Sequence, residues 1–388
     1  MGTKNYAHIN PAMLKWARTQ TPFRSIAEVV NHRPNLFTVE QIEAWENGTE
    51  YPTINQAKAL AKLYDISFAS LYLTIIPKNN LPPFTDRRTI YGYPPRPVSY
   101  ELWREIRRIT ANREIALDVA GDYLDEIEKL PTINPDENTL SIAKKIREYL
   151  GVTSPFPNKS SYEDNAFKLF RRLFENKGLM VAQLSNVEMS EIRGLSIYNE
   201  DIPIIAVNSK DSDRAKVFTL FHELAHLLRR SSSLCLIDVE EQSNIEEQFC
   251  NKIAAEILLP EDLLRDLISD MDKKAVGWNI SALSRVADKF AVSCEVVLRR
   301  LHDLNEITPE TYKGRYREIK IKFNENRKVD SEKIMVPHHY IYLNQQGYLF
   351  PKVIFSAYAN GTISYGELCR TLDVKTSTAD KIEQAIMI

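Results

Sequence analysis

Apolar residues over the first 75 positions recur at helical spacing, and each recurrence starts at a residue that can cap a helix. One cap is followed by proline, which suits a first helical position, and the others have Glu or Gln three residues later, as in a capping box. We therefore predict five short helices in this segment. The first four begin at Asn10, Ser25, Thr38 and Thr53, and the fifth runs from about Ser67 to Leu73.

The third and fourth of these helices carry a recognisable motif. Trp45-Glu46-Asn47-Gly48 ends the third helix, and Tyr51-Pro52-Thr53 precedes the fourth. This succession resembles the Xre (Cro/C1-type) helix-turn-helix family over about 65 residues. The resemblance implies a DNA-binding or partner-binding surface on the third helix, with Gln41, Trp45 and Asn47 as the candidate contacts.

The charges of this segment leave its partner open. The third helix contains three glutamates and no lysine or arginine, and the segment through residue 75 has seven basic and six acidic residues. Binding to DNA draws most of its non-specific affinity from several cations that neutralise phosphates. Direct binding to DNA and docking on a protein therefore remain alternative interpretations.

Six prolines between residues 77 and 97 interrupt the helical pattern, so 77–98 is interpreted as an extended linker. Helices are then expected over about 99–128, 138–150 and 162–176. Three short runs rich in branched apolar residues predict strands over 179–184, 194–198 and 202–207. A small sheet thus precedes the segment that carries the chemistry.

That segment, Arg214 to Arg230, is apolar and free of proline, and it contains the pattern His222-Glu223-x-x-His226. Four residues along a helix turn about 400°, so the two imidazoles project from one face and can bind one metal ion. Glu223 lies about 100° further round, where a carboxylate can act as the general base on a water molecule. The pattern predicts a metal-dependent hydrolase.

A catalytic zinc site of this kind needs a third protein ligand. A second helix, predicted from Ser243 to Pro260, offers the glutamates Glu246, Glu247 and Glu256. Glu247 shares a helix face with small residues that would let another helix approach, which favours it mildly. Position along the helix alone leaves all three open.

Longer motifs around these residues are similar to the ImmA/IrrE family of metallo-endopeptidases, over about residues 150–305. They are Arg193-Gly194-Leu195-Ser196, Val207-Asn208, the run from Arg214 to Leu228, and the run from Glu247 to Pro260. In the family's E-x-x-[AC]-N-x-[FV]-A-A pattern the leading glutamate is the third metal ligand, and it corresponds to Glu247.

The resemblance implies a Zn²⁺ enzyme, with Mn²⁺ as the alternative metal, in which Glu223 is the catalytic base. It implies a bacterial or phage protease that cleaves a DNA-binding repressor, of Xre type, and so derepresses stress, mobile-element or toxin–antitoxin genes. The competing hypothesis is a DNA-binding regulator or antitoxin whose protease domain is a sensor or inactive. The tandem with an Xre-like N-terminus is an arrangement that the family also uses.

The C-terminal part is less informative. Residues 313–333 hold eight basic and four acidic residues. We interpret them as a solvated linker with alternating strand character rather than as a nucleic-acid contact, which is the alternative. His338-His339 follows a turn at Pro337 and is expected to be a surface or partner contact, because neighbouring side chains point apart. Residues 352–386 are predicted to form a last helical unit.

The expected fold class is α+β and mostly helical. Its expected parts are an Xre-like five-helix domain at 1–76, the linker at 77–98, a zincin-like metallopeptidase domain at 99–308, and a basic linker with helices at 309–388. The peptidase domain would hold the small sheet and, over 280–304, a helical subdomain that shapes the substrate cleft.

Composition indicates the class of protein and the compartment in which we expect it. The chain has 388 residues, 44% hydrophobic and 26% charged, with a net charge of −2, which is ordinary for a globular protein. No run approaches the roughly 20 apolar residues of a membrane span, and the four scattered cysteines suit reduced thiols. We expect a cytoplasmic protein without membrane contact, whose oligomeric state the sequence leaves open.

Overall fold

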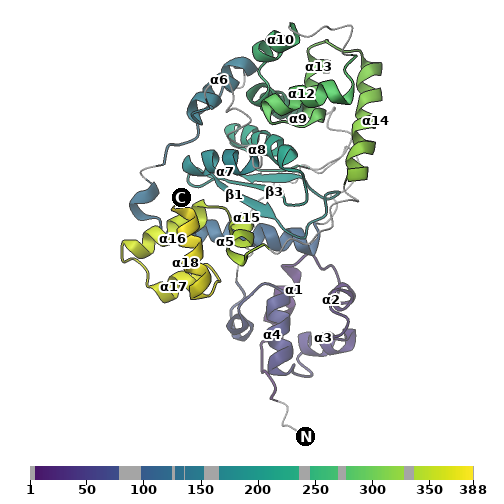
Figure 1. Ribbon diagram of the computed structural model, residues 1–388. Coiled ribbons are helices and arrows are strands. Elements are labelled where there is room, and N and C mark those ends of the chain that lie inside the picture. Colours follow the sequence, from purple (N-terminus) through teal and green to yellow (C-terminus); the bar gives the residue numbers. More distant parts are fainter. Residues whose placement is uncertain are drawn as a thin grey trace. The chain divides into compact units, whose positions relative to one another are not determined.

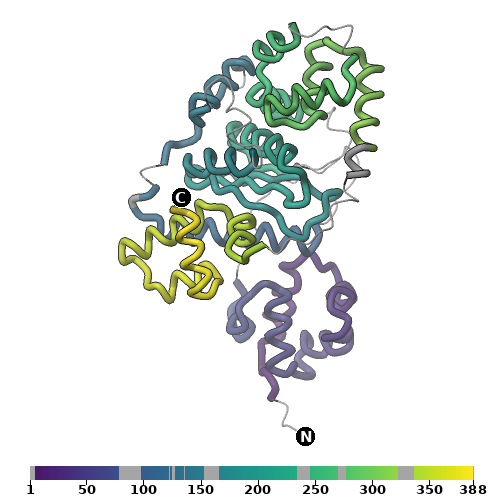
Figure 2. Tube along the Cα trace, in the orientation of Figure 1, coloured from purple at the N-terminus to yellow at the C-terminus, as the bar shows by residue number. Residues whose placement is uncertain are grey.

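The structure is a computed structural model, and Figures 1 and 2 show its course from the N-terminus to the C-terminus. The chain divides into two compact units. The first joins residues 1–83 to 96–110, and the second joins residues 84–95 to 111–388. The residues described are 5–77, 98–124, 127–134, 136–152, 166–235, 245–269, 277–326 and 336–387. Most of the predicted proline-rich linker and the predicted helix start at Ser243 lie outside them.

The N-terminal unit contains the five short helical segments that the capping signals predict. Thr38 and Thr53 each accept a hydrogen bond from the backbone of a glutamine whose side chain bonds back, so both capping boxes are confirmed. The fifth segment is a 3-10 helix rather than an α-helix. The bounds are α1 Pro11–Thr19, α2 Ile26–His32, α3 Val39–Glu46, α4 Ile54–Leu63 and η1 Phe68–Tyr72.

One core holds the N-terminal unit together. Leu14, Ile42, Leu60 and Tyr64 are fully buried in it, and they come from α1, α3, α4 and the end of α4. The Arg18 guanidinium donates to the Glu46 carboxylate at 2.7 Å, which ties α1 to α3. One of the three glutamates of α3 is therefore used inside the unit.

The second unit is built round a four-stranded sheet in the order β1-β3-β2-β4. Its strands are β1 Met180–Leu184, β2 Gly194–Ile197, β3 Ile204–Asn208 and β4 Ser233–Cys235. β1 runs parallel to β3, and the other pairs are antiparallel. The three predicted strands are present to within two residues, whereas β4 was not predicted. β1, β2 and β3 are buried at every position, so helices must cover both faces.

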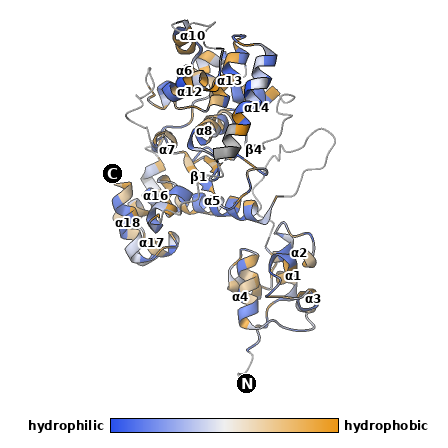
Figure 3. Cartoon of the chain, turned by 45° about the vertical axis from the view of Figure 1, so that its right-hand side comes forward, coloured by the Kyte–Doolittle hydropathy of each residue, from blue (hydrophilic) through white to orange (hydrophobic). Residues whose placement is uncertain are grey.

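Helices make up most of the remaining described chain, and the fold is α+β and mostly helical, as predicted. Figure 3 shows hydrophobic stretches in the sheet and in α8, whereas hydrophilic residues dominate α5. The helical elements are α5 Tyr100–Val119, η2 Gly121–Leu124, α6 Thr139–Tyr149, α7 Ala166–Asn176, α8 Asp213–Leu228, α9 Ile245–Leu258, α10 Glu261–Ser269, α12 Ile280–Phe290, α13 Cys294–Asp303, α14 Pro309–Asn326, α15 His338–Gln346, α16 Leu349–Ala359, α17 Tyr365–Thr371 and α18 Thr376–Ile386.

Two predictions about these helices were wrong. The helix expected over about 99–128 ends at Val119 and gives way to a 3-10 turn. The segment from Lys313 was expected to alternate like a strand, but it lies in α14 as far as Asn326. The Thr308 hydroxyl accepts from the backbone N–H of Thr311 and so caps the start of that helix, a signal that the strand interpretation overlooked.

The C-terminal helices pack against the outer strand β1 and the helix α7. The Arg171 side chain donates to the carbonyl oxygens of Val181 in β1 and Asn344 in α15. The Glu175 carboxylate accepts from the backbone N–H of Tyr348 at 2.8 Å, at the start of α16. Arg171 and Glu175 are both buried, so this junction is part of the interior of the unit.

A membrane-spanning helix is not found: within the described ranges, none combines enough length with enough apolar character to cross a bilayer.

Candidate metal centre

The helix α8 carries the His222-Glu223-x-x-His226 pattern. It is capped at its N-terminus and packs against α7 through an aromatic side chain. Its first turn is capped by the Ser212 hydroxyl, which accepts from the backbone N–H of Ala215. Phe221 packs edge-on against Phe170 and Phe174 of α7, with ring centroids 5.3 and 5.2 Å apart. These contacts hold Phe221, the residue next to His222, against α7.

The helix α9 packs directly against α8. Cys250, Ala254 and Leu258 lie on one side of α9 and are fully buried. Two of them are small, so the two helix backbones can approach closely. The predicted small-residue face therefore does face another helix, and Glu247, one turn before Cys250, reaches the two histidines.

His222, His226 and Glu247 form a group of three side chains that could hold a metal ion. The His222 Nε2 atom lies 3.2 Å from His226 Nε2 and 3.1 Å from Glu247 Oε2. The other carboxylate oxygen, Glu247 Oε1, lies 3.4 Å from His226 Nε2. Donor atoms about 2.0–2.1 Å from a tetrahedral ion lie roughly 3.3 Å from one another, so each of these distances fits side chains that share one such ion.

The charge of the group also fits a cation. The pKa of the Glu247 carboxyl would be raised by burial, but the hydrogen bonds and charges of His222 and His226 prevail and hold it well below its ordinary value. Glu247 is therefore ionised at neutral pH. Two imidazole nitrogens and one carboxylate oxygen are a donor set that zinc enzymes commonly use.

A second layer of side chains orients the two rings. His222 Nδ1 donates to the Asn251 side-chain oxygen at 3.0 Å, which leaves the Nε2 lone pair directed at the cluster. His226 Nδ1 lies 3.5 Å from Cys250 Sγ and 3.8 Å from Glu246 Oε1. All three of these supporting residues lie on α9, so one helix supplies both a candidate ligand and the supports of the other two.

The two alternative glutamates have other partners. Glu246 lies beside His226 and 3.7 Å from the Arg229 guanidinium, outside the cluster. Glu256 forms a buried ion pair with Arg300, and it accepts from the backbone N–H of Glu261. Of the three glutamates that the sequence left open, Glu247 is therefore the one that the fold brings to the histidines.

Glu223 is completely buried beside the sheet. Its Oε2 atom accepts a hydrogen bond from the Ser233 hydroxyl of β4 at 2.7 Å. Its Oε1 atom has no hydrogen-bond partner within the described part of the chain. An ionised carboxylate has acceptor capacity on both oxygens, so Oε1 retains the capacity to take a proton.

Other predicted contacts lie elsewhere. Asn47 is exposed at the end of α3, but the Gln41 side chain accepts from the Thr38 backbone N–H and Trp45 is only 3% exposed. Trp45 therefore belongs to the core of the N-terminal unit and does not present its ring to a partner. His338 and His339 begin α15, and neither belongs to the metal-binding group.

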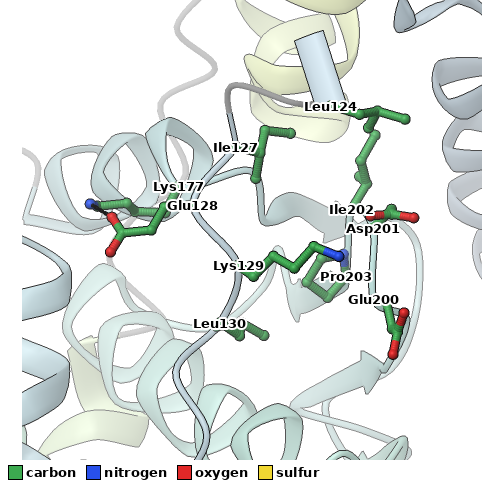
Figure 4. Close-up of a pocket in the computed structure, with 10 residues that line it drawn as sticks. All are labelled: Leu124, Ile127, Glu128, Lys129, Leu130, Lys177, Glu200, Asp201, Ile202 and Pro203. Atoms are coloured by element: carbon green, nitrogen blue, oxygen red, sulfur yellow. Dashed lines mark hydrogen bonds and ion pairs between the residues drawn. The ribbon is translucent and has the colours of Figure 1, made fainter. Parts of the chain in front are cut away.

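Ser233 and its strand gave no signal in the sequence, because three residues are too few to show an alternating pattern. Asn251 had one signal: it stands in the run from Glu247 to Pro260 that carries the family resemblance. A separate pocket, drawn in Figure 4, shares no residue with the cluster. It lies between the Glu128–Lys177 ion pair and the turn with Glu200 and Asp201.

In the second unit a histidine pair on one helix meets a carboxylate from the next, and the three side chains could hold a metal ion. Comparison with known families supports a metallopeptidase: residues 176–302 match the family Peptidase_M78, described as the IrrE N-terminal-like domain. The matched segment contains His222, Glu223, His226 and Glu247. The match supports the ImmA/IrrE resemblance and implies a metallopeptidase that acts on protein. No curated protein matches the chain.

Proposed function

We propose that this protein is a metal-dependent endopeptidase in which His222, His226 and Glu247 hold the ion and Glu223 is the catalytic base. The observation that carries the proposal is that the two imidazole nitrogens lie 3.2 Å apart and each lies 3.1 or 3.4 Å from an oxygen of the Glu247 carboxylate, across two separate helices. We take Zn²⁺ as the ion, with Mn²⁺ as the alternative, because the donors are two imidazoles and a carboxylate.

When bound, the ion would polarise the scissile carbonyl and make the attacking water more acidic. Glu223 takes a proton from that water as the water attacks the carbonyl carbon. The same carboxyl then gives the proton to the leaving amine nitrogen as the peptide C–N bond breaks, and Glu223 returns to its ionised state.

We infer further that the substrate is a DNA-binding repressor of the Xre type, whose cleavage derepresses stress, mobile-element or toxin–antitoxin genes. Two features support this inference: the matched peptidase segment, and the compact N-terminal unit with five helical segments that precedes it. A unit of that kind can dock on a partner of similar fold and bring it to the peptidase unit.

Cleavage can be tested with the purified full-length chain, an Xre-type repressor encoded beside its gene, and Zn²⁺ or Mn²⁺. We expect one discrete cut, and a loss of at least about 100-fold in kcat/KM in Glu223→Gln. Glu188→Gln is the matched control, because that carboxylate is on the surface and pairs only with Lys210 among the contacts described. Cleavage by Glu223→Gln at the rate of the control would overturn the proposal.

The second candidate function is that of a DNA-binding regulator or antitoxin, in which the peptidase unit is a sensor or is inactive. It is favoured by one observation, the exposed end of α3 at Asn47 in a unit that folds round its own core. A gel-shift assay with the DNA upstream of the gene distinguishes the two. DNA binding that weakens steeply with salt, together with equal gene regulation by wild type and Glu223→Gln, would favour the second function.

A further inference from the structure

A chain of two buried hydroxyl groups ends on the catalytic carboxylate. Ser196 of β2 and Ser233 of β4 stand opposite each other in the antiparallel pair, with their oxygen atoms 2.8 Å apart. The Ser233 oxygen is 2.7 Å from Glu223 Oε2. The exposed fractions of Ser196, Ser233 and Glu223 are 0%, 1% and 0%, so water does not compete for these hydrogen bonds.

The direction of the hydrogen bonds in this chain is fixed by chemistry. An ionised carboxylate only accepts, so Ser233 must give its single proton to Glu223. The hydrogen bond between the two serines then requires Ser196 to donate to Ser233. The result is one ordered arrangement, in which Ser196 donates to Ser233 and Ser233 donates to Glu223.

The two oxygens of Glu223 consequently differ. Oε2 is held by a short, charge-assisted hydrogen bond, whereas Oε1 is without a partner in the part of the chain that the structure covers. Oε1 lies against Gly194 of β2, where a Cβ atom would stand 3.1 Å from it and would overlap the Thr219 methyl group. Because Gly194 has no side chain, the Glu223 carboxylate can lie against the strand at this position.

We propose that Ser233 is a positioning residue for the reaction, supported by Ser196: it anchors Oε2 to the sheet so that Oε1 is the oxygen that receives the proton. This inference rests on the proposed function. A rigid strand is a better anchor than a loop, because β4 is paired with β2 and the sheet is covered by helices. Loss of the anchor frees the carboxylate to rotate and leaves Oε2 buried without a donor.

The test compares Ser233→Ala with Ser232→Ala in the full-length chain loaded with Zn²⁺. The Ser232 hydroxyl accepts from the backbone N–H of Tyr198 and does not contact Glu223, so it controls for damage to this end of the sheet. We expect Ser233→Ala to lower kcat about 10- to 100-fold with KM and zinc content unchanged. Ser232→Ala should keep kcat within about twofold of wild type.

Three further variants make the outcome decisive. Ser233→Thr keeps the hydroxyl and should recover most of the rate, and Ser196→Ala should lower kcat less than Ser233→Ala does, because Ser233 can still donate. In a Glu223→Gln background, Ser233→Ala should cause no additional loss, since the anchored group has gone. Equal kcat in Ser233→Ala and wild type, or equal losses in Ser233→Ala and Ser232→Ala, would overturn the inference. Activity in Glu223→Gln would instead overturn the proposed function.

Discussion

Single side chains distinguish the candidate metal centre from its surroundings, and we propose that Glu247 completes it. It lies between His222 and His226, whereas Glu246, its neighbour in the sequence, lies at the far side of the His226 ring. The two carboxylates are chemically identical and differ only in where the helix directs them.

We predict that Glu247→Gln lowers zinc affinity at least about 100-fold, because a neutral amide replaces the one anionic donor. Glu246→Gln should bind zinc within about tenfold of wild type, because it changes only a support of His226. Competition against a chromophoric chelator measures both affinities. Tight, stoichiometric zinc in Glu247→Gln would show that another residue completes the site.

At this scale the sequence determines the histidine pair but not the rest of the site. The pair and Glu223 follow from helix geometry alone, because they lie within one turn or so of each other. The proposed third ligand, Glu247, lies 21 residues beyond His226, and a helical wheel ranks the candidate glutamates only weakly. Ser233 reaches Glu223 through strand pairing, which no local pattern of polar and apolar residues reveals.

At the scale of helices and strands, too, the sequence predicts features that depend on neighbouring residues better than features that depend on the whole element. Caps predict where helices begin, and the predicted caps all stand at observed N-termini: Asn10, Ser25, Thr38 and Thr53. α14 was mistaken for a strand because its charges and aromatic residues alternate over a few positions. In the structure Tyr312 and Tyr316 stack on one side of the helix, at the four-residue spacing that only a helix brings together.

The start of α16 gives a prediction at the scale of elements. Gly347 has φ +88°, and a Cβ there would overlap the Glu175 carboxylate and the Val181 carbonyl oxygen. We predict that Gly347→Ala lowers the free energy of unfolding by about 2 kcal/mol or more, because it adds this overlap to the cost of the left-handed backbone.

Gly361→Ala separates the two causes. Gly361 has φ +73° with open space round it, so alanine there costs only the backbone conformation, about 1 kcal/mol. Urea denaturation of the three proteins gives the comparison. Equal losses at the two glycines would mean that the crowding at Gly347 has no effect on stability.

For the whole molecule, stability depends on pH through a carboxyl that is not part of the candidate metal centre. Burial raises the pKa of Glu175 to about 7, although Arg171 and the N–H groups of Tyr348 and Leu349 act in the opposite direction. The folded state therefore binds this proton more tightly than the unfolded state, where the pKa is near its ordinary 4.5. The stabilisation is complete below about pH 4.5 and is lost as the pH rises through about 7.

We predict that the second unit loses up to about 3 kcal/mol of unfolding free energy from this group between about pH 4.5 and pH 7. Other carboxyl groups add their own pH dependence, so the quantity to measure is the difference between wild type and Glu175→Gln in urea titrations across this range. Glutamine does not ionise, and its stability curve should rise relative to wild type as the pH increases. Parallel curves would contradict the prediction.

The helix α7 contacts two segments that are far apart in the sequence, α8 and the C-terminal helices. Phe170 and Phe174 pack against the ring of Phe221, which precedes His222. Arg171 and Glu175, the residues that follow them, form hydrogen bonds with the C-terminal helices. The packing of α8 beside the histidine pair and the attachment of the C-terminal helices therefore use neighbouring residues of one eleven-residue helix. A substitution that displaces α7 is therefore expected to disturb both the contacts beside His222 and the docking of the C-terminal helices.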